Sequence, residues 1–114
     1  MHELSIALGI IDFATEEATR RNSRVTGIHL RLGPLSGVVK DALLFSYDIA
    51  TADTPLAGSR LVIDEVPVVV YCPAWREPRT LESMQHLACP TCGSPTPEVR
   101  EGRELEVVAL ELEP

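Results

Sequence analysis

Two separate groups of residues in this 114-residue chain have the chemistry to bind metal ions. The first is the tripeptide Met1-His2-Glu3, and the second combines Cys72 with a C-x-x-C motif formed by Cys89 and Cys92. An amine beside an imidazole and backbone amides suits square-planar Ni(II) or Cu(II), whereas clustered thiolates suit tetrahedral zinc. The two groups together indicate metal handling rather than catalysis.

The amino-terminal group offers four nitrogen donors. The Met1 amine, the His2 amide and imidazole, and the Glu3 amide close chelate rings around a square-planar ion once the amides lose their protons, which Ni(II) and Cu(II) promote. The bulk of His2 disfavours removal of Met1, so we expect the amine to persist. A chain can also begin Met-His by chance, in which case the imidazole is simply solvated.

The thiol group resembles a four-thiolate zinc site with one ligand missing. Trp75 stands where the second cysteine of a first C-x-x-C pair would be, and its indole N–H donates hydrogen bonds but cannot bind a metal ion. The residues leave four sources open for a fourth ligand: His86, Glu77, water, or a side chain from a second copy of the chain. The alternative is a metal-free turn in which Trp75 packs as an apolar plug.

Composition limits the classes of function. The net charge of −7 repels phosphate backbones, so we expect no nucleic-acid partner. No apolar run is long enough to span a membrane, and the start lacks the basic and apolar segments of a secretory signal, so we expect a cytoplasmic protein. Three cysteines in a reducing compartment favour thiolate metal ligation over disulfides. With aromatic residues at only 4%, the core must be aliphatic.

Hydrophobic periodicity predicts the elements that position these groups. It indicates helices over residues 4–21 and 36–50, and strands over residues 25–33, 60–71 and 105–112. Pro67 places part of the strand region 60–71 at a sheet edge, because proline lacks an N–H group. A phase shift between Val107 and Val108 predicts a bulge in the last strand.

These elements predict an α+β fold in which two helices pack on a small mixed or antiparallel sheet, with an inserted zinc-ribbon-like knuckle module. Residues 1–70 plus 103–114 would form the nickel-binding α+β domain, and residues 71–102 the zinc-knuckle insertion. The insertion is rich in proline and has few apolar residues to bury, so it needs a stabilising crosslink such as a bound metal ion.

The chain resembles the HypA/HybF family of hydrogenase nickel-incorporation proteins over essentially its whole length. The resemblance rests on Met1-His2-Glu3 at the start of a helix, on the segment 25–33 (VTGIHLRLG), and on the late knuckle Cys89-Pro90-Thr91-Cys92-Gly93. Trp75 is the departure from the family pattern. It puts in doubt the zinc affinity and the rigidity of the knuckle, but leaves the nickel assignment unaffected.

The resemblance implies a metallochaperone, not an enzyme, that binds Ni(II) as cargo at Met1, His2 and Glu3 for maturation of [NiFe]-hydrogenase. It assigns Cys72, Cys89 and Cys92 to a structural Zn(II). It also implies two partners, a maturation GTPase of the same pathway and the hydrogenase large subunit, and some family members serve urease. The oligomeric state stays open, a homodimer with exchanged strands included.

Two rival interpretations belong to other classes of protein. In the first, the chain is a small zinc-stabilised protein-interaction module of metalloenzyme assembly that has lost nickel delivery. Such a module would differ little in sequence from a nickel carrier. A redox enzyme built on Cys89 and Cys92 is less well supported, because the motif sits in a Gly/Pro turn and no helix follows it.

Overall fold

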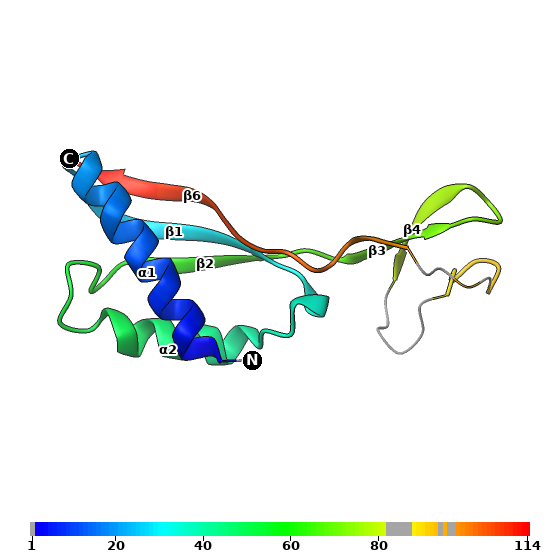
Figure 1. Cartoon of the computed structure of the whole chain (residues 1–114), viewed down its shortest axis with the longest axis horizontal. Coiled ribbons are helices and arrows are strands. Elements are labelled where there is room, and N and C mark those ends of the chain that lie inside the picture. The colour runs from blue at the N-terminus through cyan, green and yellow to red at the C-terminus, as the bar shows by residue number, and fades with distance from the viewer. Residues whose placement is uncertain (1, 82–87, 94, 96–97) are drawn as a thin grey trace.

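The computed structural model describes residues 2–81, 88–93, 95 and 98–114. The chain is elongated, with principal extents of 52 × 24 × 15 Å, and has two parts (Figure 1). Two helices and a three-stranded sheet form the larger part, and a second three-stranded sheet with the cysteine turns forms the smaller one. The α+β fold class predicted from the sequence is therefore confirmed.

Helix α1, Glu3–Arg20, positions the amino-terminal residues. Its apolar face buries Ala7, Ile10, Ile11 and Ala14 against the first sheet, while Glu3 at its positive end and Arg20 in its last turn match the helix dipole. The helix ends in a Schellman motif, because Asn22 adopts a left-handed φ of 50° and the Ser23 N–H bonds to the Ala18 carbonyl at 2.9 Å.

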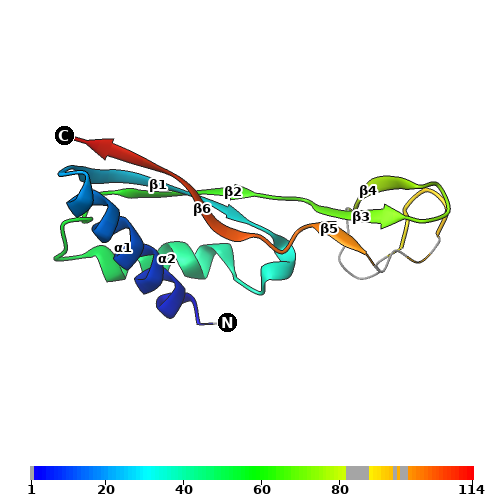
Figure 2. The ribbon, with the colours of Figure 1, turned by 45° about the horizontal axis from the view of Figure 1, so that its top comes forward.

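The first sheet is mixed and has the order β2-β1-β6. Strand β1, Arg24–Leu32, lies in the middle, parallel to β2, Arg60–Glu65, and antiparallel to β6, Leu105–Glu113. His29 pairs with Ala109 and the next residue pairs with Val107, so Val108 is the extra residue of a bulge. The predicted bulge is confirmed. Figure 2 shows both helices beneath one face of this sheet.

The second helix begins later than the sequence pattern predicts. A short 3-10 turn, Pro34–Ser36, replaces its expected first turn, and α2 spans Lys40–Thr51. The physical reason is Gly37, whose φ of 81° ends the 3-10 turn in the left-handed region and turns the chain before α2 can start. Helix α2 then buries Leu43, Tyr47 and Thr51.

The predicted single strand over residues 60–71 is wrong in one respect, because it forms two strands in two different sheets. Strand β2 ends at Glu65, the Val66 N–H bonds to the Leu32 carbonyl at 2.9 Å, and β3 runs from Val68 to Cys72. Pro67 separates them, since it has no N–H group to continue a ladder. The proline therefore marks the passage between the two parts of the molecule.

The second sheet is antiparallel and has the order β4-β3-β5. Strand β4 spans Glu77–Leu81 and β5 spans Val99–Glu101. Among its described residues, the buried apolar side chains are Val68 and Val70, together with Cys72 and Cys89. The main hydrophobic core lies between the helices and the first sheet. The division into residues 1–70 plus 103–114 and residues 71–102 stays a prediction.

Candidate metal centres

The three cysteines come together at one point of the second sheet. Their sulfur atoms all lie within 4.8 Å of one another, and the Sγ atoms of Cys72 and Cys92 are 3.6 Å apart. Cys72 and Cys89 are buried, Cys92 is exposed, and none of the three is in a disulfide. The thiols that the sequence pattern singled out therefore form one compact cluster with metal-binding geometry.

Two turns of the same kind carry these thiols. In the first, the Arg76 N–H bonds to the Cys72 carbonyl at 2.7 Å, and in the second the Gly93 N–H bonds to the Cys89 carbonyl at 2.8 Å. Both turns close on a left-handed residue, with φ of 56° at Arg76 and 74° at Gly93. The first turn therefore keeps the backbone of a metal-binding knuckle.

Trp75 takes the place in the first turn that Cys92 takes in the second, three positions after the leading cysteine. Its side chain is 54% exposed, so it does not plug the interior of the module. The interpretation of Trp75 as a buried apolar plug is therefore wrong. The turn offers one thiolate where two would be needed for a four-thiolate site.

The cluster favours ionised sulfur at Cys89. Burial opposes ionisation of that thiol, but hydrogen bonds from the backbone N–H groups of Cys92 and Thr91 outweigh it. With further hydrogen bonds from the thiols of Cys92 and Cys72, they lower the pKa of Cys89 to about 6. Burial instead raises the pKa of Cys72, against a hydrogen bond from the Trp75 N–H. Cys89 is therefore a thiolate at neutral pH, whereas Cys72 would have to lose its proton to bind a metal ion.

Among the candidate fourth ligands, Glu77 begins β4 directly opposite Cys72, and His86 lies outside the described residues. The sequence patterns did not single out Arg79, whose Nη1 donates to Glu77 Oε2 at 2.6 Å. Arg79 pairs with Val70, so it lies on the same face of the sheet as Cys72. The alternation of side chains along a strand would have identified Arg79, because residues two apart, such as Glu77 and Arg79, lie on the same face.

The donor set fits zinc. Thiolate sulfur is a preferred zinc ligand, structural zinc sites are tetrahedral, and three thiolates within 4.8 Å can share one ion. Cys72, Cys89 and Cys92 would hold it, and the ion would join the two knuckle turns. The small apolar content of this sheet gives such a crosslink a structural role.

The amino-terminal residues lie at the start of α1. His2 is the N-cap of the helix, is exposed, and makes no capping hydrogen bond with its side chain. Its carbonyl accepts from the Ile6 N–H at 3.1 Å, which begins the helical ladder. Because N–H groups of the first helical turn have no intrahelical acceptor, the amides of His2 and Glu3 are outside that ladder.

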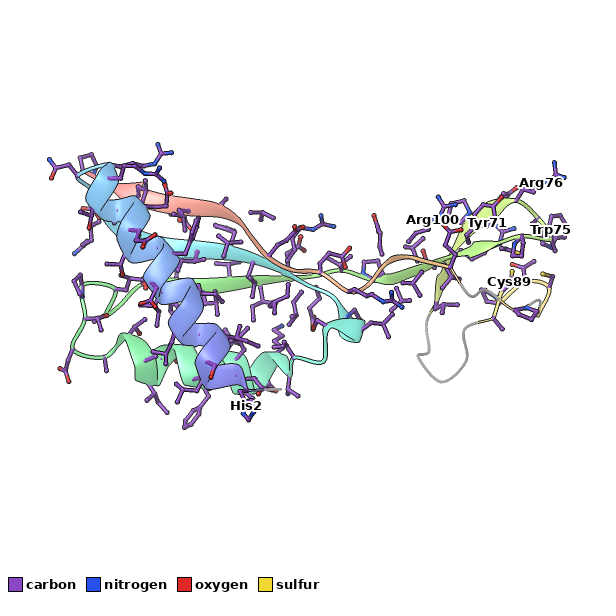
Figure 3. The ribbon with its side chains drawn as sticks, in the orientation of Figure 1. His2, Tyr71, Trp75, Arg76, Cys89 and Arg100 are labelled. Atoms are coloured by element: carbon purple, nitrogen blue, oxygen red, sulfur yellow. The ribbon has the colours of Figure 1, made fainter. Side chains whose placement is uncertain are left out.

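The Glu3 side chain has a different neighbour. Its Oε1 accepts a hydrogen bond from the Val39 N–H at 3.4 Å, at the start of α2. The carboxylate is thus directed to the second helix, which leaves the backbone nitrogen of Glu3 as its donor toward a metal. His2 and Cys89 lie in different parts of the elongated molecule (Figure 3), so the two candidate centres are separate sites.

His29 lies on the surface of the first sheet. His29 Nε2 and Glu111 Oε2 are 2.8 Å apart, and Arg60 also contacts Glu111 at 3.3 Å. His29 therefore has a carboxylate partner on the neighbouring strand β6. Within the described ranges, no helix is both long and apolar enough to cross a membrane.

Comparisons with known proteins agree with the geometry. The family described as "Hydrogenase/urease nickel incorporation, metallochaperone, hypA" matches residues 1–112. Two curated relatives are named "Hydrogenase maturation factor HypA". The one from Chloroflexus aurantiacus is 50% identical, over 97% of this chain and 98% of its own length. The one from Roseiflexus is 48% identical, over 99% of this chain and 93% of its own length.

A solved structure has the same fold. The solution structure of "the Ni metallochaperone HypA from Helicobacter pylori" superposes with a TM-score of 0.65 at 18% sequence identity, over 99% of this chain and 98% of that one. A second solution structure, of "HypA protein", superposes with a TM-score of 0.71 at the same identity, over 98% and 96%. At this identity the likeness concerns the fold alone.

Proposed function

This chain belongs to the HypA family of hydrogenase/urease nickel-incorporation metallochaperones, and we propose that it carries Ni(II) at Met1, His2 and Glu3 for maturation of [NiFe]-hydrogenase. The carrier binds and releases a metal ion and catalyses no reaction of its own. The observation that carries the proposal is the position of His2, an exposed N-cap whose imidazole makes no capping hydrogen bond.

The chelate suits the end of a helix. With the amine, the imidazole and two deprotonated amides as ligands, the charge of Ni(II) is balanced by the two amide anions. A neutral complex is not repelled by the positive end of the α1 dipole, which would disfavour a bare cation. Protons that return to the amide nitrogens displace the metal, so a partner that disturbs the first turn of α1 would favour release.

The zinc centre has a structural role in this proposal. Cys72, Cys89 and Cys92 bind Zn(II), which holds the two knuckle turns together and leaves the nickel site to the other part of the chain. The thiolates need a reducing compartment, so the proposed place of action is the cytoplasm. The proposed partners are a GTPase of the same maturation pathway, which would act on the carrier, and the hydrogenase large subunit, which would receive the metal.

Complementation tests delivery. Cells that contain a [NiFe]-hydrogenase and lack their own copy of this protein would receive the parent chain, His2→Ala or His29→Ala. We expect the parent and His29→Ala to restore hydrogenase activity, and His2→Ala to restore it only with excess nickel in the medium. Equal restoration by His2→Ala at low nickel would contradict nickel delivery and favour the protein-interaction module.

A further inference from the structure

The thiol cluster lacks one ligand for a closed zinc site. Structural zinc is almost always four-coordinate, and the three cysteines supply three ligands. Trp75 fills the fourth position of the two knuckle turns without an atom that can bind zinc. A ligand from elsewhere must therefore complete the site, or the fourth position stays open to solvent.

The hairpin of β3 and β4 places Glu77 opposite a cysteine of the cluster. Cys72 and Glu77 are directly opposite each other in the antiparallel ladder, and side chains of such pairs point to the same face. Cβ atoms of directly opposed residues are typically about 4.5–5.5 Å apart. Glu77 is thus the cross-strand neighbour of a thiol that the cluster uses.

Arg79 holds this carboxylate from the same strand. It lies two residues after Glu77 on the same face of β4, and its Nη1 bonds to Glu77 Oε2 at 2.6 Å. The guanidinium therefore contacts the carboxylate that lies opposite Cys72.

One atom of that guanidinium has no hydrogen-bond partner among the described residues. Arg79 Nε is buried and makes no hydrogen bond within the described part of the chain. Buried donors are nearly always satisfied, so this N–H is aimed where an acceptor is expected. Ligands of a metal ion are commonly held by such outer hydrogen bonds, which orient them toward the ion.

We propose that Glu77 supplies the fourth ligand of the zinc site, in place of the thiolate that Trp75 replaces, and that Arg79 is its positioning residue. The inference rests on the zinc site proposed above. Three thiolates and one carboxylate give zinc the same total ligand charge as four thiolates. Arg79 donates to Glu77 and holds its carboxylate in place.

X-ray absorption at the zinc edge tests the ligand set of the zinc-loaded chain. We expect three sulfur atoms at about 2.3 Å and one oxygen at about 2.0–2.2 Å, without the outer-shell scattering of an imidazole ring. Imidazole scattering would instead identify a histidine such as His86, and four sulfur atoms would indicate a second copy of the chain. Either result would overturn the assignment of Glu77.

Competition with a zinc chelator tests the same claim by affinity. We expect Glu77→Ala to lower zinc affinity at least tenfold. Glu98→Ala is the matched control, because Glu98 is also paired with an arginine of the second sheet, Arg100, and is about equally exposed, at 56% against 57%. Equal affinity of Glu77→Ala and the parent would overturn the proposal while zinc binding by the cysteines stood. No zinc binding by the parent would overturn the zinc site as well.

Double variants separate a ligand from a merely structural residue. In a Trp75→Cys background a fourth thiolate is present, so Glu77→Ala should no longer lower zinc affinity. Arg79→Leu should weaken zinc binding in the parent but add nothing to Glu77→Ala, because both changes remove one interaction. A full loss of affinity from Glu77→Ala in the Trp75→Cys background would contradict Glu77 as a ligand. Additive losses from Glu77→Ala and Arg79→Leu would contradict Arg79 as its positioning residue.

Discussion

The Sγ atoms of Cys72 and Cys92 lie 3.6 Å apart although 20 positions separate them in the chain. Each sulfur comes from a knuckle turn closed by the same backbone hydrogen bond, at Arg76 in the first turn and at Gly93 in the second. The first turn has the same backbone geometry as the second, with a tryptophan at the position of the second thiol. The two turns therefore differ in one metal-binding side chain and not in the backbone that presents it.

The intact turn makes the fourth thiolate recoverable. We predict that Trp75→Cys raises zinc affinity by about tenfold or more, a free-energy gain of ~1.4 kcal/mol, because the added thiol meets three sulfur atoms already in place. Competition with a chromogenic chelator would measure it. Trp75→Ala controls for removal of the indole and should leave the affinity near that of the parent. An unchanged affinity of Trp75→Cys would show that position 75 does not face the ion.

Zinc binding should release fewer than three protons per ion at pH 7.5. Cys89, with a pKa of about 6, is already a thiolate there and releases none, whereas Cys72, with its raised pKa, must lose a proton. Below about pH 6 Cys89 is protonated as well, so zinc affinity should fall more steeply with acidification. Calorimetry in buffers of different ionisation enthalpy gives the proton count. A release of three protons at pH 7.5 would contradict the lowered pKa of Cys89.

Removal of zinc should loosen one part of the chain only. The second sheet buries few apolar side chains, whereas the core around Ile28, Leu30 and Leu43 lies elsewhere. We predict that a chelator increases hydrogen exchange in β3 and β5 and leaves exchange in α1 and β1 unchanged. Exchange measured by mass spectrometry with and without chelator would show this. A uniform increase would mean that the two parts unfold together.

Two glycines meet where the parts of the molecule join. A Cβ atom on Gly33 would lie 2.1 Å from the carbonyl oxygen of Gly102, which is backbone and cannot turn aside. We predict that Gly33→Ala lowers the free energy of unfolding by about 2–4 kcal/mol, an effect in the range of severe steric changes. Denaturant unfolding would measure it. Gly9→Ala is the control, with open space at its Cβ in α1, and should stabilise by about 0.5–1 kcal/mol.

Local patterns predicted the larger part of the fold well. The period of apolar residues located α1, and the phase shift in the last strand located the bulge at Val108, because both depend on which face of one element is buried. The break at Pro67 was harder to place. A proline marks an interrupted ladder, but which sheet each half joins depends on partners distant in the sequence, such as Leu32 for Val66.

The candidate sites divide in the same way. Residue type and spacing singled out the three cysteines, and the structure brings their sulfur atoms within 4.8 Å of one another. The assignment of His2 to nickel stays a prediction. The retained shape of the Trp75 turn and the role of Arg79 were not identified, since a hydrogen bond to the Cys72 carbonyl and a cross-strand pair with Val70 are tertiary facts.

A Ni(II) titration of the untagged chain, followed by visible absorption and circular dichroism, tests nickel carriage most directly. We predict one square-planar ion per chain for the parent and for His29→Ala, and no such species for His2→Ala or for a chain with an acetylated amine, with the helix content of all four unchanged. The affinity of the parent should fall steeply with acidification, because protons compete for the amide nitrogens. Equal square-planar binding by His2→Ala would contradict the site at Met1, His2 and Glu3.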